Sequence, residues 1–336
     1  MRACVYGAGS LGTVLGAYIS KAGVPIDLIN RNEEHVRVLN EQGAKITGTV
    51  NFVQPVTALL PAQMTGQYDI IFLLTKQLYN HDVAQFLRAY LSPLGAVVCL
   101  QNGIPEPGLI EDLGINHVLG CVVEWGATMT EPGCCEVTSR PECMTFHMGI
   151  NTHVSSSVRN EAIRLLSLMC PVMIEANLDG VRWSKLLINA TFSGLGTVIG
   201  GTFGDVVKDK NVRPIVLRCM KEIIDVGHAA GVEFAPVQGK NIVQLFYYNS
   251  PMKQKFAEML LPIAMRKHFG IEPSMLQDLR HNKRCEARSI NGMICEYGRK
   301  YGVRTPINDG IEHLIIQMEK HEVPIMHDNY RVLQNR

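Results

Sequence analysis

The segment 182–196, RWSKLLINATFSGLG, places one lysine in an otherwise apolar run. On a helix, residues four apart lie about 40° apart around the axis, so Lys185, Asn189 and Ser193 are expected to form one polar strip. Burying an unpaired ammonium group costs free energy. The lysine therefore either extends to solvent, or pairs with a carboxylate that holds the structure together, or takes part in chemistry.

The surrounding residues favour the chemical interpretation. Four glycines follow the lysine, at Gly194, Gly196, Gly200 and Gly201. Each costs about 1 kcal/mol relative to alanine inside a helix, so we expect another segment to pack against this backbone or the helix to end there. Downstream, SMLQDLRHNKRCEARSINGM supplies a hydroxyl at Ser274 and a carboxylate at Glu286. They approach the lysine only if the turn between their segments brings them together.

A glycine-rich turn near the N-terminus predicts a dinucleotide site. VYGAGSLG lies between an apolar run and a helical pattern, and its loop consists of Gly7, Ala8, Gly9, Ser10, Leu11 and Gly12. One glycine makes the tight turn, one lets the backbone approach a pyrophosphate, and one allows close packing of helix and strand. The alternative is a glycine turn without a ligand.

The end of the second strand indicates which dinucleotide binds. A carboxylate at this position usually accepts the free ribose hydroxyl of NAD, whereas this chain has Asn30 and Arg31. A guanidinium group suits a 2′-phosphate, so we predict NADP(H); the alternative is that Arg31 is a solvated surface charge. Lys76 and Asn102 follow two further strands, where they are expected to contact cofactor or substrate unless they are ordinary loop residues.

These residues need a sheet to position them. Apolar runs alternate with helical patterns through residues 1–176, which predicts a Rossmann-type, doubly wound α/β domain with added antiparallel strands. Residues 177–336 are expected to form an all-helical domain, with the substrate site where the two halves meet. The predicted helices span 179–200, 211–230, 236–268, 273–301 and 308–320.

Composition narrows the class of protein. The chain has 336 residues, 46% of them hydrophobic, and a net charge of +1, which provides no overall field to attract nucleic acid or an anionic membrane. Its ten cysteines include no C-x-x-C pair, so we expect no metal site. The first predicted strand begins at Arg2, and no apolar run reaches about 18 residues. We therefore expect a cytoplasmic protein without a signal peptide or membrane span.

Several motifs together resemble the ketopantoate reductase (2-dehydropantoate 2-reductase) family over nearly the whole chain. They are GAGSLG at 7–12, LLTK at 73–76, QNG at 101–103, EPG at 131–133, W-x-K-L-x-x-N at 183–189, SMLQD at 274–278, E-x-x-x-I-N-G at 286–292 and YGVRTPIN at 301–308. The resemblance implies NADPH-dependent reduction of 2-dehydropantoate to (R)-pantoate, a step of pantothenate biosynthesis.

The resemblance also implies roles for single residues. Lys185 is the expected proton donor to the keto oxygen, and Glu286 the acid that holds the lysine and the developing hydroxyl. The expected substrate contacts are Asn189, Ser193, Ser274 and Asn102. The expected cofactor contacts are the glycine loop, Arg31, Lys76, Asn102 and Glu286.

The chain departs from the family pattern on the substrate side. Ser193-Gly194 replaces the usual Asn-Pro or Asn-Gly, Arg288 stands where an acid is usual, and Glu124-Trp125 replaces small or hydroxylated residues. These changes leave open a different 2-oxo acid as substrate, or a non-catalytic NADP(H)-binding regulator. Segment 241–273 is longer than usual and carries apolar residues at helical spacing, so we expect a longer core helix or a helix of a homodimer interface.

Overall fold

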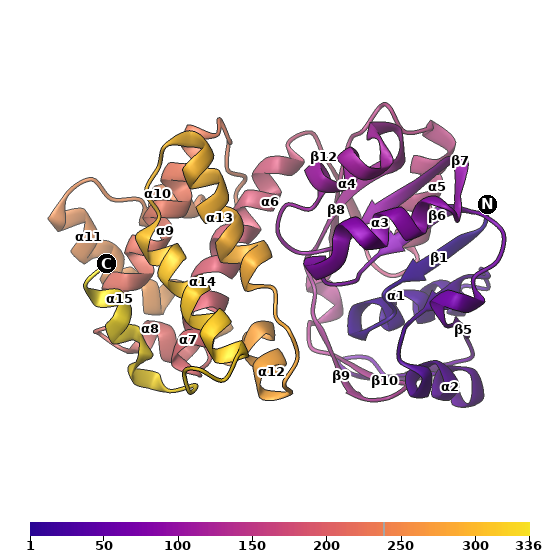
Figure 1. Cartoon of the computed structure of the whole chain (residues 1–336), viewed down its shortest axis with the longest axis horizontal. Coiled ribbons are helices and arrows are strands. Elements are labelled where there is room, and N and C mark those ends of the chain that lie inside the picture. The colour runs from indigo at the N-terminus through magenta and orange to yellow at the C-terminus, as the bar shows by residue number, and fades with distance from the viewer. Residues whose placement is uncertain (238) are drawn as a thin grey trace. The chain divides into compact units, whose positions relative to one another are not determined.

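The computed structural model describes residues 1–237 and 239–336, which form two compact units, Met1–Leu178 and Asp179–Arg336. Figure 1 shows the sheet in the first unit and the helices of the second. The change from strand to helix signals near residue 176 lies close to this division.

The first unit is built on an eight-stranded sheet in the order β12-β11-β8-β7-β6-β1-β2-β5. All neighbouring strands pair in parallel except β11 and β8, which are antiparallel. The strands are β1 (Ala3–Tyr6), β2 (Asp27–Ile29), β5 (Thr57–Leu59), β6 (Tyr68–Leu73), β7 (Leu91–Cys99), β8 (Val118–Val123), β11 (Phe146–Gly149) and β12 (Val172–Glu175). The predicted Rossmann-type sheet with an added antiparallel strand is confirmed.

Helices cover both faces of this sheet, which explains why its central strands are apolar throughout. Val5, Phe72 and Val98 belong to the core shared with α1 (Ser10–Lys21) and α5 (Ser156–Ser167). The alternate residues, such as Cys4 and Ile71, pack with α3 (Asn80–Arg88) and α4 (Glu106–Leu113). The remaining helix of this unit, α2 (Glu33–Gln42), follows β2.

A second, four-stranded sheet was not predicted as such. Its order is β4-β3-β10-β9, with β3 (Ala44–Gly48), β4 (Phe52–Gln54), β9 (Ala127–Glu131) and β10 (Cys134–Val137). Only β10 lies in a segment, CCEVTS at 134–139, whose sequence predicts a strand. The others are short and partly exposed, so they lack the continuous apolar run that marks a central strand.

The second unit is helical in the part that the structure describes, apart from one bridge between Val237 and Lys240. Its helices are α6 (Leu178–Ile188), a π-helix (Asn189–Ser193), α7 (Gly194–Ile199), α8 (Phe203–Lys208), α9 (Arg213–Ala229), α10 (Ile242–Phe246), α11 (Pro251–Ala264), α12 (Ser274–Arg280), α13 (Ala287–Tyr301), α14 (Pro306–Glu319) and α15 (Arg331–Gln334). The predicted helical class is confirmed.

Two of the predicted helices are wrong in extent. The helix expected over 236–268 begins only at Ile242 and breaks before Pro251, because Asn241 and Ser250 each cap a new helix by accepting a backbone N–H. The helix expected over 273–301 is two helices. The first ends near Asn282, whose φ of 53° is left-handed and cannot continue a right-handed helix.

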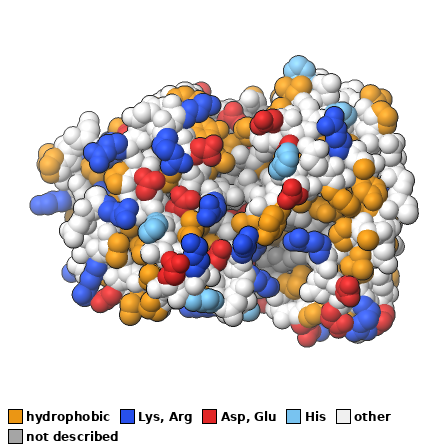
Figure 2. Space-filling model, viewed as in Figure 1, with side chains coloured by type: hydrophobic (Ala, Val, Ile, Leu, Met, Phe, Trp, Pro, Cys, Tyr) orange, Lys and Arg blue, Asp and Glu red, His pale blue; other side chains and the backbone are white. Residues whose placement is uncertain are grey.

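No helix within the described residues combines the length and apolarity that a bilayer crossing requires. On the face drawn in Figure 2, acidic and basic side chains are interspersed, in keeping with the net charge of +1.

Candidate active site

The strand order creates a ligand-binding position at the carboxyl end of β1. From β1 the chain continues to β2 on one side and later returns to β6 on the other, and open α/β sheets bind ligands where the strand order reverses in this way. Gly7 follows β1 here with φ of 97°, and a Cβ on it would lie 2.5 Å from the backbone nitrogen of Thr75, which follows β6. Only glycine fits this turn.

The other two glycines of the loop have different surroundings. A Cβ on Gly12 would lie 2.5 Å from the oxygen of Gly7, so α1 packs directly on the turn. A Cβ on Gly9 would meet nothing closer than 4.0 Å, so this backbone faces open space that an incoming group can approach. The N–H groups of Ser10 and Leu11, with that of Gly12, precede the first intrahelical bond of α1 and suit a phosphate.

Asn30 and Arg31 behave differently at the end of β2. The Asn30 side chain turns inward: its Nδ2 donates to the oxygen of Ala8 at 2.7 Å, and its Oδ1 accepts from the nitrogen of Asn32 at 2.8 Å. Arg31 is exposed, and within the described residues it makes no ion pair. Burial raises the pKa of Tyr6, and the charge of the Arg31 guanidinium opposes this in part, so that charge acts near the end of β1. The geometry is compatible with the predicted phosphate contact.

A hydrogen-bond network that the sequence analysis missed joins the ends of β6 and β7. The Gln101 amide donates to the oxygen of Thr75 at 2.8 Å and to Oδ1 of Asn80 at 2.7 Å. The backbone oxygen of Asn102 accepts from the side chain of Gln77. The network therefore holds the segments that carry Lys76 and Asn102, both half-buried, at the same sheet edge as the glycine loop. The QNG motif was the available signal.

The lysine segment is not the continuous α-helix that the sequence predicted. Lys185 lies on α6, but residues Asn189–Ser193 form a π-helix before α7 begins. A π turn holds about one residue more than an α turn, so the expected strip of Lys185, Asn189 and Ser193 is wrong in its geometry. Lys185 and Asn189 are half-buried, whereas Ser193 is buried. π-helices occur frequently at functional sites.

Asn291 holds the π segment in place. Its Nδ2 donates to the oxygen of Ala190 at 2.9 Å and to Oδ1 of Asn308 at 3.0 Å, and the whole side chain is buried. A Cβ on Gly194 would lie 2.9 Å from Oδ1 of Asn291, which explains the glycine there. Trp183 packs on Tyr297 with ring centroids 5.3 Å apart, whereas Ala190, later in the first segment, contacts Asn291, earlier in α13. The two contacts show that α13 runs antiparallel to α6 and the π-helix.

These contacts bring the segments that carry the candidate residues of the second unit against one another. Glu286 is buried at the start of α13, the helix that Asn291 fixes to the π segment. Pro273 sits against Gly196, where a Cβ would come within 2.7 Å of its ring, and this contact docks the start of α12 with the exposed Ser274 on α7. The expectation that the glycines mark close packing is confirmed at Gly194 and Gly196.

The residues that depart from the family pattern occupy separate environments. Trp125 is buried edge-on against Phe146, with ring centroids 5.9 Å apart. Glu124 lies 3.3 Å from Nε2 of His147, whose Nδ1 lies 2.7 Å from Glu175. The hydrogen bond to Glu124, followed by that to Glu175, raises the pKa of His147 despite its partial burial.

Arg288 is exposed on α13, where its charge moderates the raised pKa of Glu312. Glu312, Asp309 and Cys295 place their ligand atoms within 4.8 Å of one another. Burial raises the pKa of the Cys295 thiol.

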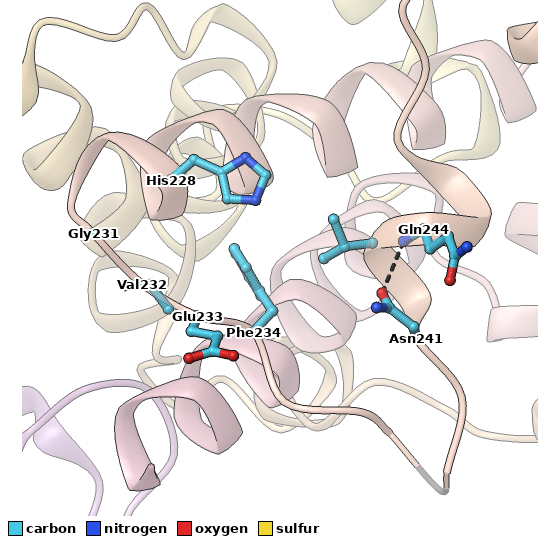
Figure 3. Close-up of a pocket in the computed structure, with 8 residues that line it drawn as sticks. His228, Gly231, Val232, Glu233, Phe234, Asn241 and Gln244 are labelled. Carbon is cyan, nitrogen blue, oxygen red and sulfur yellow. Dashed lines mark hydrogen bonds between the residues drawn. The ribbon is translucent and has the colours of Figure 1, made fainter.

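A hollow of about 550 Å³ lies elsewhere in the second unit, between the end of α9, the loop after it and α10 (Figure 3). Its lining residues are His228, Gly231, Val232, Glu233, Phe234, Asn241, Val243 and Gln244. None of the candidate catalytic residues is among them.

Comparison with known proteins agrees with this arrangement. A 2-dehydropantoate 2-reductase of Streptococcus pyogenes is 25% identical over 317 residues, covering 94% of this chain and 97% of the relative. A D-mandelate dehydrogenase solved with NADH and anilino(oxo)acetate matches 96% of this chain and 99% of its own, with 22% identity and a TM-score of 0.79. A dimeric ketopantoate reductase from Staphylococcus aureus matches 96% of this chain and 100% of its own, with 17% identity and a TM-score of 0.74.

Two family models together match most of the chain. The model for ketopantoate reductase PanE/ApbA covers residues 3–147, and the model for its C-terminal part covers residues 177–319. The first includes the glycine loop, and the second includes the lysine segment and the start of α13. The chain belongs to the ketopantoate reductase PanE/ApbA family.

Proposed function

We propose that this protein reduces a 2-oxo acid to the corresponding 2-hydroxy acid with NADPH, and that 2-dehydropantoate, giving (R)-pantoate, is its substrate. The observation that carries the proposal is that a dinucleotide-type glycine loop and a half-buried lysine on a π-interrupted helix each lie in a part of the chain matched by the family models. The 2-dehydropantoate 2-reductase of Streptococcus pyogenes supports the substrate.

In this proposal the first unit holds the cofactor. The start of α1 binds the pyrophosphate through the N–H groups of Ser10, Leu11 and Gly12, and the open face of Gly9 allows the close approach. Arg31 binds the 2′-phosphate, since it is exposed and the neighbouring Asn30 side chain carries no charge and is already bonded. Lys76 and Asn102 contact the cofactor on the β6 and β7 side.

The second unit supplies the proton and the substrate contacts. When bound, the reduced nicotinamide supplies a hydride to the carbonyl carbon. Lys185 donates a proton from Nζ to the carbonyl oxygen and takes one back from solvent, so one hydride and one proton add to each substrate molecule. Its positive charge also stabilises negative charge on that oxygen. Asn189, Ser193 and Ser274 bind the substrate, and Glu286 orients the lysine and the new hydroxyl.

A second candidate function is the same reduction of a 2-oxo acid, but with a different acid as the substrate or a different nicotinamide cofactor. The D-mandelate dehydrogenase relative was solved with NADH and an aromatic oxo acid analogue. Ser193 and Arg288 stand where the family pattern has other residues, which favours a different 2-oxo acid. A regulator that binds NADP(H) without turnover is the remaining alternative.

One experiment separates these candidates. Oxidation of NADPH and of NADH is followed across 2-dehydropantoate and a panel of other 2-oxo acids, with Lys185→Ala beside the wild type. We expect the best kcat/KM with NADPH and 2-dehydropantoate, and a kcat lower by about 10²–10⁴-fold in Lys185→Ala, the usual contribution of general acid catalysis. A higher kcat/KM with another acid selects the second candidate. NADPH binding without turnover of any acid selects the regulator.

We also propose that the protein forms a homodimer through α11. Four apolar side chains on this helix are exposed at spacings of four, three and four residues: Met252 (82%), Phe256 (64%), Met259 (72%) and Ile263 (72%). This is the spacing of a coiled-coil seam. An antiparallel pair of α11 helices about a two-fold axis sets Phe256 against Met259 of the other copy, a favourable sulfur–aromatic contact.

Charge does not oppose a second copy as the occupant. Lys253 and Lys255 flank the N-terminal half of the stripe, and the antiparallel arrangement keeps the lysines of the two helices apart. The exposed apolar stripe is also unusual for a monomer. The dimeric relative from Staphylococcus aureus is consistent with this assembly.

A further inference from the structure

Three side chains converge on one backbone oxygen beneath the glycine loop. The oxygen of Ala8 accepts from Nδ2 of Asn30 at 2.7 Å, from Oγ1 of Thr13 at 3.0 Å and from Nε2 of His35 at 3.0 Å. These donors come from the end of β2, from α1 and from α2. Two of them, Thr13 and His35, are fully buried. The carbonyl of Ala8 is therefore fixed toward the interior of the unit.

The partners of His35 determine its tautomer. The backbone N–H of Gly133, in the EPG turn between β9 and β10, donates to Nδ1 of His35 at 2.9 Å. A backbone N–H can only donate, so Nδ1 carries no proton and Nε2 carries it. Nε2–H then points at the oxygens of Ala8 and Thr13, the latter 3.1 Å away. A neutral ring can make all of these hydrogen bonds. A protonated ring carries a second proton on Nδ1, which faces the N–H of Gly133 and repels it.

The EPG motif is explained by the same contact. Gly133 has φ of 77°, and a Cβ there would lie 2.4 Å from Cγ1 of Val38 on α2. Only glycine allows the turn to come this close to α2 and direct its N–H at His35. The turn, α2 and the glycine loop are thus joined through one imidazole ring.

The position of Ala8 matters for the loop. The N–H groups of Gly7 and Ala8 both donate to the oxygen of Ile29, at 3.0 and 2.9 Å, so the loop is held on its other side as well. Fixing the Ala8 carbonyl sets the plane of the next peptide, and so the direction in which Gly9 faces open space and the start of α1 presents its N–H groups.

We propose that His35, as its neutral Nε2–H tautomer, is a positioning residue that holds the glycine loop in the conformation that binds the dinucleotide pyrophosphate. The proposal rests on the cofactor site proposed above. His35 acts through Ala8 and does not touch the cofactor. Its substitution therefore changes cofactor affinity, while kcat at saturating cofactor is retained.

The surroundings of His35 indicate a pH dependence. Burial lowers its pKa, and the hydrogen bond to Ala8 opposes this only in part. Thr13 of α1 and Gly133 of the turn are uncharged, and the nearby Cys135 of β10 stays protonated because burial raises its pKa to about 12. The charged residues of the adjoining segments are exposed, except Asp27 of β2, which is half-buried and paired with Arg2. The exposed ones are Lys21, Arg31, Glu33, Glu34, Arg37, Glu41, Lys45, Glu131 and Glu136.

The test compares His35→Leu and His35→Gln with the wild type by NADPH fluorescence titration of the full chain. His35→Leu removes every hydrogen bond of the ring, and we expect the Kd for NADPH to rise roughly tenfold, as for the loss of a buried hydrogen bond. The amide N–H of His35→Gln can reach the oxygen of Ala8, so its Kd stays within about threefold of the wild type. Arg37→Ala, at an exposed position of the same helix, is the matched control and leaves Kd unchanged.

The pH dependence of the Kd for NADPH distinguishes this role from a merely structural one, which would leave that dependence unchanged. Wild-type affinity should fall as the pH drops through the lowered pKa of His35, because the protonated ring repels the N–H of Gly133. His35→Gln lacks this component. Titration of the cofactor's 2′-phosphate near pH 6 affects both proteins alike, so the difference between their profiles reports His35.

The outcomes separate this proposal from the proposed function. A wild type that binds neither NADPH nor NADH overturns the cofactor site and this inference together. A wild type that binds, with His35→Leu equal to it in Kd and in pH profile, overturns the positioning role and leaves the proposed function intact. If His35→Leu does not fold, identical pH profiles for the wild type and His35→Gln overturn the positioning role.

Discussion

Replacing Asn291 with leucine tests whether this buried amide maintains the π segment that follows Lys185. Leucine has nearly the same volume, so the change removes hydrogen bonds without creating a large cavity. The oxygen of Ala190 loses its donor, whereas Oδ1 of Asn308 keeps the Cys219 thiol at 3.6 Å. One buried acceptor left unpaired costs about 1–3 kcal/mol. Within the described residues Oδ1 of Asn291 has no hydrogen-bond partner, and its removal offsets part of that cost.

We therefore expect Asn291→Leu to lower the free energy of unfolding of the second unit by about 2 kcal/mol. The chain has two tryptophans, and Trp183 is buried in the second unit beside Tyr297. In a Trp125→Phe background, urea unfolding followed by tryptophan fluorescence reports on that unit alone.

Arg288→Ala is the matched control, since Arg288 is exposed on the same helix and its removal should change stability by less than about 0.5 kcal/mol. We also expect kcat to fall in Asn291→Leu, because Lys185 lies on α6 just before the π segment that Asn291 holds. An unfolding free energy for Asn291→Leu within about 0.5 kcal/mol of the control would show that the amide does not hold the π segment.

Two further predictions concern the cofactor and the assembly. Arg31→Ala should raise the KM for NADPH by roughly tenfold or more and leave the KM for NADH unchanged, because a charge-assisted bond to the 2′-phosphate is lost; equal effects on both cofactors in steady-state kinetics would exclude this contact. Phe256→Lys should convert the dimer to a monomer in light scattering, with Lys210→Ala, an exposed lysine outside α11, as the control. A wild type that is already monomeric at micromolar concentration would refute the α11 interface.

The sequence was sufficient to predict local features whose cause is local. The tight turn at Gly7 and the alternation of apolar strands and helices follow from backbone geometry and periodicity. The same is true of the glycines of the lysine segment, since a glycine inside an apolar helix implies a close neighbour. For these features the residue type itself carries the physical constraint.

Features that depend on contacts between distant segments required the tertiary structure. Nothing near Asn291 in the chain identifies Ala190 as its partner, and the π-helix that this bond accompanies changes the face on which Ser193 lies. The short strands of the second sheet are stabilised by pairing rather than by their own composition, so their sequences carry little signal.

His35 shows the same division. Nothing in the sequence around His35 connects it with the glycine loop, and only the fold brings its ring within 3.0 Å of the Ala8 oxygen and 2.9 Å of the Gly133 nitrogen. The sequence alone determined which residues can make a nucleotide-binding turn and a proton donor, because those properties belong to single side chains and short segments. The tertiary structure decided what holds each of them in position, because a hydrogen bond between residues 98 apart depends on how the chain folds and not on the spacing of its letters.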